Sequence, residues 1–573
     1  MKKIISLAVL ALGLVIVSCS DDFLDKDPQG TLNPATLANA DGVEALLISA
    51  YSLLDGWEGG WSTGGGAPWN AAASNWTYGD VYSDDAYKGT EAGDQPALEL
   101  LENYTIDASN PYMIGRWARL YDGIARANDV INVAELAEDI DAATKAIIIG
   151  EARFLRGHYH FEAQRLWDNV PYISEADTDV RVSNSGPIWS QIEADMSAAA
   201  SALSSDPRNG QIGRVNKMSA TAYLGKVQLY QQNYAAALGN FNTVINSGKY
   251  GLNDNYHTNF RLEGNNGIEA VFQIQASVND GAGAGNGNQG DQLNHLQGGP
   301  GGGCCGFHQP SQNLVNQFKT DGGLPVANFN AVDVANDDGL TSGDAFTPHA
   351  GTLDPRLDRT VGRRGIPYLD WGVHPGAQWV RNQAYAGPYS PIKKMYYASE
   401  QGTGSDTQAG WHGAGNTAIN HSIIRFADVM LMAAECEVEV GSLETARSHV
   451  NAIRTRAANE STWVKDASGA NAANYEIGTY DDAWTSQSAA RDAVRTERRL
   501  ELAMEGHRFF DLKRWGVAQS VLNDYLAVES TKRSYLIGAN FQAKNIRFPI
   551  PQEAIDESSD DDGNATLTQN EGF

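Results

Sequence analysis

Residues 216–246, NKMSATAYLGKVQLYQQNYAAALGNFNTVIN, carry the clearest structural signal in this chain. Leu224 and Gly225 in the first half are followed by Ala237 and Phe241 in the second half. These offsets match the small and aromatic packing positions of a tetratricopeptide unit. The stretch therefore predicts a helical hairpin whose turn lies near residues 229–234.

A weaker copy of this pattern lies at residues 423–457, on the two sides of a Gly441-Ser442 turn. The matching positions are Ala434, Ala446, Val450 and Ile453. One helical hairpin cannot bury its own apolar face, so several must stack to form a core. The sequence therefore predicts a mostly α fold. Its tetratricopeptide-like helices are expected at about residues 33–56, 111–250 and 421–457.

The segments between these helices have a different composition. Residues 57–100 and 251–420 are rich in Gly, Asn, Asp and aromatic residues, and 281–306 hold 11 glycines in 26 positions. Loops of this length are uncommon in compact domains unless they are functional or disordered. We interpret them as a loop-rich ligand region over the scaffold. With the C-terminal region 490–573, they complete a single domain over residues 33–573.

The first residues predict export and a lipid anchor. Lys2 and Lys3 precede the apolar run Ile4–Val17, which is too short to span a bilayer and reads as a signal peptide over residues 1–18. Cys19 would then be the first mature residue and the site of lipidation, followed by a tether over 19–32. The alternative is an ordinary secretory leader with an incidental cysteine.

Charge and cysteine content exclude several classes of function. The net charge of -28 repels phosphate backbones, so nucleic acid is not an expected partner. Cys304 and Cys305 are adjacent in a glycine-rich loop and could form a vicinal disulfide or stay free. No further Cys or His lies at a fitting spacing, so neither a metal site nor another cofactor is expected.

Two sequence patterns typical of enzymes are present, but the residues around them argue against a catalytic role. Residues 60–64 match G-x-S-x-G, but a helix rather than a strand is predicted before them. Glu497, Glu501 and Glu505 are spaced to line one helix face, and paired carboxylates are the catalytic groups of a glycosidase. Arginines at 495, 498, 499 and 508 surround them and would hold them ionised in salt bridges. We therefore expect no catalytic residues and no enzyme activity.

Tryptophans in the loops are the best indication of a ligand. Their flat apolar faces can stack on sugar rings, while nearby polar groups bind hydroxyls. The alternative is that these rings only fasten long loops to the scaffold. The candidate ligand-binding residues are Trp57, Trp61, Trp69, Trp76, Asp84, His295, Trp371, Trp379 and Trp411.

Residues 498–516, RRLELAMEGHRFFDLKRWG, resemble the signature helix and turn of the SusD/RagB family of outer-membrane nutrient-binding lipoproteins. Further matches are IRFADVML at 424–431, DPRL at 354–357 and FPIP at 548–551, followed by LTQN at 567–570. The resemblance covers essentially the whole mature chain. One departure is Cys304-Cys305, where relatives often have an aromatic residue before Gly306-Phe307.

The resemblance implies a SusD-like fold of four tetratricopeptide-like hairpins. It also implies an extracellular lid on a SusC-like TonB-dependent transporter, lipid-anchored through Cys19 at the outer face of the outer membrane. Such a protein captures oligosaccharides or sometimes peptides. We expect a cell-surface glycan-binding lipoprotein that delivers a neutral glucan-type oligosaccharide or polysaccharide; the alternative is a peptide-capturing, RagB-like protein.

Overall fold

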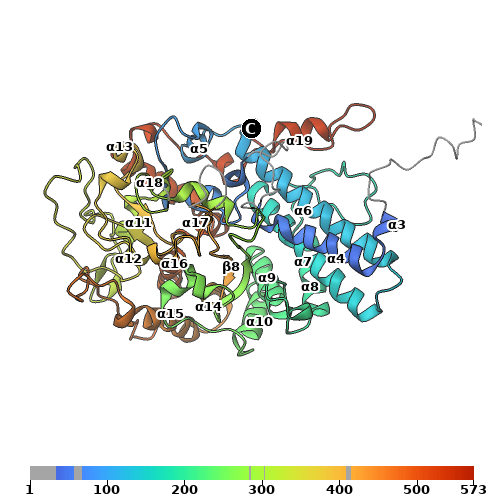
Figure 1. Ribbon diagram of the computed structural model, residues 1–573, viewed down its shortest axis with the longest axis horizontal. Coiled ribbons are helices and arrows are strands. Elements are labelled where there is room, and N and C mark those ends of the chain that lie inside the picture. The colour runs from blue at the N-terminus through green and yellow to red at the C-terminus, as the bar shows by residue number, and fades with distance from the viewer. Residues whose placement is uncertain (1–33, 57–66, 283–284, 302, 408–414) are drawn as a thin grey trace, which may run out of the picture.

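The computed structural model describes residues 34–56, 67–282, 285–301, 303–407 and 415–573 (Figure 1). Long helices occupy one half of the molecule, where α4, α6, α7, α8, α9 and α10 pack one on the next in that order. The bounds of the helices in this part of the chain are α3 Pro34–Leu37, α4 Ala40–Ser52, α5 Pro96–Glu102, α6 Pro111–Leu136, α7 Ala142–Trp167, α8 Trp189–Ala202, α9 Lys217–Tyr230 and α10 Tyr234–Ile245. α14 then packs on α10, although the loop-rich segment separates the two helices in sequence.

The later helices lie within that segment (α11 to α13) and after it (α14 to α19). They are α11 Gln312–Gln317, α12 Leu357–Thr360, α13 Gln383–Ala386, α14 Phe426–Val440, α15 Leu443–Ala457, α16 Gln487–Leu502, α17 Arg508–Arg514, α18 Ala518–Glu529 and α19 Gln552–Glu557. α14 contacts both α15 and α16. The mostly α fold predicted from the sequence is confirmed.

The α9–α10 hairpin shows why the repeat pattern forms this structure. The Asn216 side chain accepts hydrogen bonds from the first amides of α9, which starts the helix. Phe241 on α10 is fully buried, and a Cβ atom added to Gly225 on α9 would lie only 2.7 Å from its ring. The small residue therefore lets the two helices approach, as the spacing predicted.

The second hairpin, α14–α15, follows the same logic. Ser442 caps α15 by accepting a hydrogen bond from the Thr445 amide. Ala434, Ala446, Val450 and Ile453 are all fully buried, as their spacing predicted. Because α14 packs on α10, the two hairpins form one continuous core.

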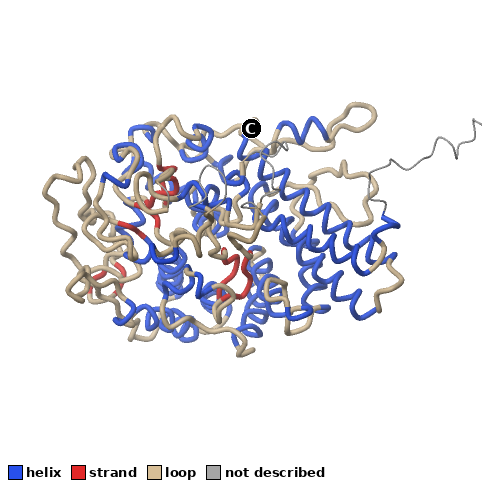
Figure 2. Tube along the Cα trace, viewed as in Figure 1, coloured by secondary structure: helices blue, strands red, loops and turns tan. Residues whose placement is uncertain are grey.

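The other half of the molecule combines the later helices with long loops and short antiparallel strand pairs (Figure 2). The pairs are β1 Ala86–Gly89 with β3 Phe307–Pro310, β2 Ala270–Ile274 with β8 His421–Arg425, β4 Thr320–Asp321 with β5 Leu324–Pro325, and β6 Val361–Gly362 with β7 Ser390–Pro391. β8 leads directly into α14, so the β2–β8 pair attaches the loop-rich half to the scaffold. Cys304 and Cys305 in this half form a vicinal disulfide.

A buried network of ion pairs lies beneath α16. Glu497, Glu501 and Glu505 are all paired with cations, as expected, but the predicted partners were wrong. The expectation that all three share one helix is also corrected, because α16 ends at Leu502 and Glu505 lies in the turn after it. Their partners are Arg356, Lys393, Arg425, Arg454 and Arg456, from other segments of the chain. Arg498, Arg499 and Arg508 instead bind Asp428, Asp511, Asp84 and Asp85. Sequence neighbours around a helix point in different directions, so proximity along the chain did not identify the pairs.

The pKa of Glu505 shows how strongly this network holds its charge. Burial raises the pKa of this carboxyl, but Arg425 and Lys393 more than reverse the effect and lower it to about 2. A carboxylate held ionised in this way is not available as a general acid. Among the described residues, no helix has both the length and the apolar character needed to cross a membrane.

Candidate ligand-binding face

The predicted site residues fall into three groups in the structure. Trp57, Trp61 and Trp411 lie outside the described residues, as does the predicted lipidation site Cys19. Trp69, Trp76, Asp84 and His295 are buried. Trp371 and Trp379 are half-buried and belong to one cluster in the loop-rich half.

Trp76 and Trp69 are buried residues that stabilise the fold. Trp76 is completely buried, donates its indole N–H to the Gly290 carbonyl at 3.0 Å and meets the Phe307 ring edge-on. Trp69 is 6% exposed and belongs to the main core. Neither indole presents a face on which a sugar could stack, so the prediction of ligand contact is corrected for both. They fasten the 68–81 segment to residues 289–294 and 307, which is the alternative that the sequence left open.

Asp84 is likewise structural. It is 2% exposed, and its carboxylate accepts hydrogen bonds from Arg508 at 2.7 and 2.9 Å. Burial alone would raise the pKa of Asp84, but Arg499 and Arg508 lower it to about 2. Its hydrogen-bonding capacity is used within the fold, so the expectation that it binds ligand is corrected.

His295 is 1% exposed, with its ring centroid 6.2 Å from that of Tyr396. The Gly301 backbone approaches so closely that an added Cβ atom would lie 2.5 Å from His295 Nδ1. The imidazole therefore lies beneath the loop surface. It supports the neighbouring aromatic residues instead of reaching a ligand itself, which corrects the prediction.

Trp371 and Trp379 rest on a small hydrophobic cluster separate from the main core, which we call the Tyr396 cluster. Its buried members are Leu296, Tyr368, Ile392, Met395, Tyr396 and Ile419. The Trp371 indole N–H donates to the Tyr396 carbonyl at 2.8 Å, and its ring meets the Tyr396 ring edge-on at 5.9 Å. One hydrogen bond and one ring contact therefore fix the orientation of this side chain.

Trp379 is held by three neighbours. Its ring meets Tyr368 edge-on at 5.7 Å and His374 at 5.1 Å. On another side lies Gly299, where an added Cβ atom would be 2.8 Å from the indole. Both tryptophans are thus partly exposed rings on a buried base. Such preorganised aromatic surface loses little conformational entropy when a flat apolar ligand stacks on it.

A groove of about 670 Å³ at the end of α4 is the second feature of this region. Its polar lining is mainly side-chain amides, hydroxyls and arginines, with an apolar part from Ile48, Tyr51, Leu54 and Ile274. The polar residues are Ser52, Asp55, Arg126, Gln211, Arg214, Gln273, Gln275, Ser277 and Asn286. Amides and an aromatic ring in one concave surface suit a neutral polar ligand.

Residues 277–282 and 285–288 lie between this groove and the loops around the Tyr396 cluster. Ser277 and Asn286 line the groove, while Asn279 donates to the Gly402 and Ser405 carbonyls. The groove also reaches Asp55, two positions before Trp57 in the chain. Sequence reasoning missed the groove because α4, α6, the 211–214 turn and β2 each contribute only a few residues.

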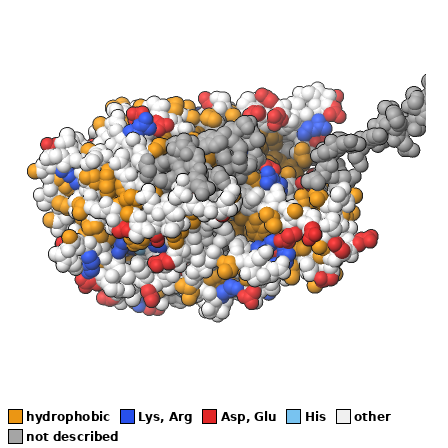
Figure 3. All heavy atoms as spheres, viewed as in Figure 1, with side chains coloured by type: hydrophobic (Ala, Val, Ile, Leu, Met, Phe, Trp, Pro, Cys, Tyr) orange, Lys and Arg blue, Asp and Glu red, His pale blue; other side chains and the backbone are white. Residues whose placement is uncertain are grey.

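The surface carries exposed acidic side chains, in agreement with the net charge of -28. Acidic side chains gather at the helical end of the face in Figure 3, with hydrophobic side chains exposed between them and the loop-rich half. Among the described residues, no group of three or more His, Cys, Asp or Glu side chains is arranged to hold a metal ion.

Comparisons with known proteins agree with this architecture. A family model described as the SusD family matches residues 268–573, and one described as "Starch-binding associating with outer membrane" matches residues 22–229. SusD-like protein P25 from Formosa agariphila is 24% identical over 568 residues, covering 94% of this chain and 95% of its own. SusD-like protein P2 from the same organism is 25% identical, covering 91% and 92%.

Solved structures match over nearly the full length. Surface glycan-binding protein A from Bacteroides fluxus has a TM-score of 0.67 at 23% identity, covering 93% of this chain and all of its own. A laminarin-binding SusD-like protein has a TM-score of 0.65 at 22% identity with the same coverage. Surface glycan-binding protein A from Bacteroides thetaiotaomicron, in complex with laminarihexaose, has a TM-score of 0.65 at 20% identity, covering 93% and 99%. These likenesses establish the fold.

Proposed function

The chain belongs to the SusD family, and from this we propose that it is a cell-surface binding protein that captures oligosaccharides for a SusC-like TonB-dependent transporter. The family supports a binding role at the outer membrane, since one matching model describes starch binding in association with that membrane. Proteins of the same fold bind laminarin and laminarihexaose. The transporter partnership rests on the family resemblance.

The observation that carries the proposal is the pair of half-buried indoles on the Tyr396 cluster. Trp371 and Trp379 come from one loop-rich segment and share a buried base, so both rings are held in place before a ligand arrives. Aromatic side chains that retain exposed area on a rigid base are the usual energetic centres of binding surfaces. The amide-rich groove beside α4 supplies hydrogen-bonding groups for hydroxyls.

We propose a neutral glucan as the ligand. The net charge of -28 disfavours polyanionic sugars, and stacking on indoles needs the apolar faces that glucose rings present. Laminarin, the ligand of a protein with the same fold, is the first glucan to test. The alternative ligand is a peptide, which would use the apolar part of the groove beside α4.

Binding without turnover is part of the proposal. The carboxylates that most resembled glycosidase residues, Glu497 and Glu501 on α16 and Glu505 just after it, are buried and paired with arginines. A retaining or inverting glycosidase needs one carboxyl group that stays protonated beside the substrate. The charge network lowers the pKa of Glu505, which is the opposite requirement.

The location is proposed from the sequence and the family. Residues 1–18 would be removed, Cys19 would carry lipid, and residues 19–32 would tether residues 33–573 to the outer face of the outer membrane. The tether would raise the effective concentration of the binding protein beside its transporter.

Affinity electrophoresis against a panel of soluble polysaccharides, followed by calorimetry, tests the binding role. The panel contains laminarin, mixed-linkage β-glucan, soluble starch and an anionic pectin. We expect retardation by at least one neutral glucan and none by pectin. Trp371→Ala and Trp379→Ala should each weaken binding by about 2 kcal/mol, or about thirtyfold, the usual loss at an aromatic hot spot.

Trp463→Ala is the matched control, because Trp463 is also half-buried but packs on a different cluster, against Tyr475. It should leave glucan binding unchanged. Release of reducing sugar ends from the glucan would contradict the binding role and indicate an enzyme. Retention of peptides in place of all four polysaccharides would favour the alternative.

A further inference from the structure

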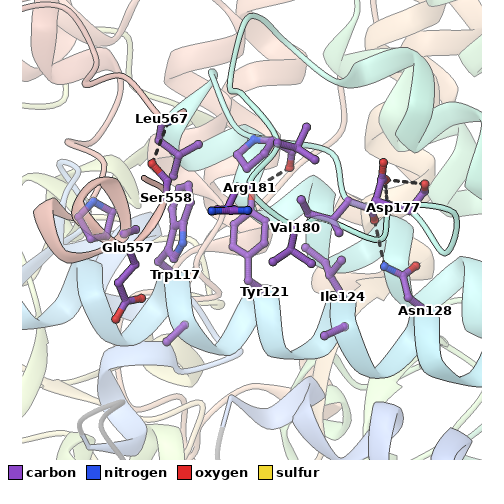
Figure 4. A pocket seen from close by; sticks show the side chains of 18 of the residues that line it. Trp117, Tyr121, Ile124, Asn128, Asp177, Val180, Arg181, Glu557, Ser558 and Leu567 are labelled. Atoms are coloured by element: carbon purple, nitrogen blue, oxygen red, sulfur yellow. Dashed lines mark hydrogen bonds between the residues drawn. The ribbon is translucent and has the colours of Figure 1, made fainter. Parts of the chain in front are cut away.

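A second groove lies over α6, and the proposed glycan site does not use it. It has a volume of about 520 Å³, within the range of roughly 300–1,000 Å³ that ligand sites occupy. Its walls come from α6, from the segment 171–182 and from the C-terminal stretch between Pro551 and Leu567 (Figure 4). None of these segments contributes to the Tyr396 cluster.

The floor of this α6 groove is aromatic and rigid. Trp117 and Tyr121, one helical turn apart on α6, are stacked with ring centroids 4.6 Å apart and planes 29° apart. Trp117 meets Trp167 of α7 edge-on at 5.1 Å, and the Tyr121 hydroxyl donates to the Pro171 carbonyl at 2.9 Å. The floor is therefore fixed by both α7 and the segment that forms the opposite wall.

The wall facing this floor exposes apolar surface to water. Val180 is 68% exposed and points into the groove beside Tyr121 and Ile124 (Figure 4). Val182, Pro551, Ala554 and Leu567 continue the apolar lining. A single exposed valine is ordinary, but one that lines a concave apolar surface extends an area that a partner can cover.

The rim of the groove carries uncompensated negative charge. Asp129 on α6, Asp177 in the 171–182 segment, and Glu553 and Glu557 on α19 line the groove, and none makes an ion pair with any residue in the described ranges. The cation that lines the groove, Arg181, is already bound by Asp179 at 2.9 Å and Asp561 at 3.0 Å. The local field therefore attracts positive charge.

We propose that the α6 groove docks a protein segment that combines apolar side chains with lysine or arginine. The apolar side chains would cover Val180 and the Trp117–Tyr121 floor, and the cations would pair with the four rim carboxylates. Such pairing at a rim steers association and fixes orientation.

Two other occupants fit less well. A neutral glycan carries no cation to pair with the four rim carboxylates. The chain's own tether carries Asp21, Asp22, Asp25 and Asp27, which the acidic rim would repel.

Selection from a random 12-residue peptide library on the intact mature protein tests this inference. We expect recovered peptides to be rich in Lys or Arg together with apolar residues. One recovered peptide is then measured by calorimetry against Glu557→Lys and Val180→Ser. Each substitution should weaken binding about fivefold, because rim charge pairs and single exposed methyl groups contribute modestly.

Matched controls separate the groove from general effects. Asp556→Lys changes the charge equally on the neighbouring position of α19, which does not line the groove. Val332→Ser removes a valine that is 70% exposed and also lies outside it. Both should bind the peptide like the wild type.

Three results would overturn the inference. These are recovery of no peptide, recovery of acidic or neutral sequences, and equal losses in the groove variants and their controls. If laminarihexaose binding is lost in Val180→Ser but kept in Trp371→Ala, the α6 groove holds glycan instead. Because the groove and the Tyr396 cluster share no residues, failure here leaves the proposed glycan role untouched.

Discussion

The amide of Gly506 donates to both carboxylate oxygens of Asp80, at 2.9 and 3.1 Å, in the interior of the protein. Gly506 lies in the signature segment 498–516, whereas Asp80 lies in the buried π-helical turn η3, Trp76–Val81. His308 completes the site with its Nε2 atom 2.9 Å from the same carboxylate. The segment that identifies the family therefore also holds the base of the 68–85 loop.

We expect Gly506→Ala to destabilise the protein strongly. Gly506 has a φ of +79°, and a Cβ atom would lie 1.9 Å from the Ser74 carbonyl oxygen. The loss in unfolding free energy should exceed about 3 kcal/mol, because strain and a backbone clash add. Urea unfolding measures it. Gly516→Ala has a similar φ of +70° but open space around it, so it should cost only about 1 kcal/mol; equal losses would contradict this explanation.

Glu501→Gln should lower the unfolding free energy by about 3–5 kcal/mol, since it leaves buried arginines without their counter-charge. Glu501 is fully buried and binds Arg425 at 2.6 Å and Arg356 at 3.0 Å. Calorimetric unfolding at neutral pH checks the loss. The control is Glu444→Gln, which removes an exposed pair with Arg447 and should change stability little. A similar small effect at Glu501 would show that the network contributes little to stability.

Glu102→Gln should become more stabilising relative to the wild type as pH rises from about 4 to 8. Burial raises the pKa of Glu102 to about 7, although hydrogen bonds from Tyr535 and the Lys88 amide oppose the shift. Between the unfolded pKa of about 4.3 and this value, the folded wild type binds more protons than the unfolded chain, so its stability falls as pH rises. The variant lacks this loss.

The relative gain should be on the order of 2–3 kcal/mol across this pH window. Urea unfolding of both proteins at several pH values measures it, with the exposed Glu138→Gln as control. A difference for Glu102→Gln that stays constant with pH would show that this carboxyl titrates normally in the fold.

Gly299→Ala should weaken glucan binding without a comparable loss of stability. An alanine Cβ atom would lie 2.8 Å from the Trp379 indole, so this half-buried ring would have to move. Displacement of one stacking ring should lower the affinity about tenfold, somewhat less than its removal. Calorimetry with laminarin checks this. Gly93→Ala, with open space around it, should bind normally; unchanged affinity in Gly299→Ala would argue against a role for Trp379.

The helical scaffold was predictable because its determinants are local. Gly225 and Phe241 lie on the two helices of one hairpin, as do Ala434 and Ala446. Residues that are close along the chain therefore also pack together in the fold. The paired state of Glu497, Glu501 and Glu505 was also predictable, since closely spaced carboxylates need cations to balance their charge. Their partners were not, because Arg356, Arg425 and Arg454 come from three other segments.

The loop tryptophans show where reasoning from the sequence ends. Trp76 and Trp371 both lie in Gly- and Asp-rich loops, yet Trp76 is completely buried and Trp371 is half-buried on the Tyr396 cluster. The difference arises from what packs against each ring: the η7 segment Gln289–Asn294 covers Trp76, while Trp371 lies at the edge of its cluster. No periodicity in a loop encodes that contact.

Residue spacing and motifs alone were therefore enough for the mostly α scaffold, the family and the pairing of Glu497, Glu501 and Glu505. The tertiary structure decided which tryptophans keep exposed area, which carboxylates are neutralised and where the two grooves lie. Helical periodicity is a pattern of residues close together in the sequence, so the sequence alone reveals it. Burial of a loop side chain and the shape of a groove depend on segments that meet only after folding, so they follow from long-range packing.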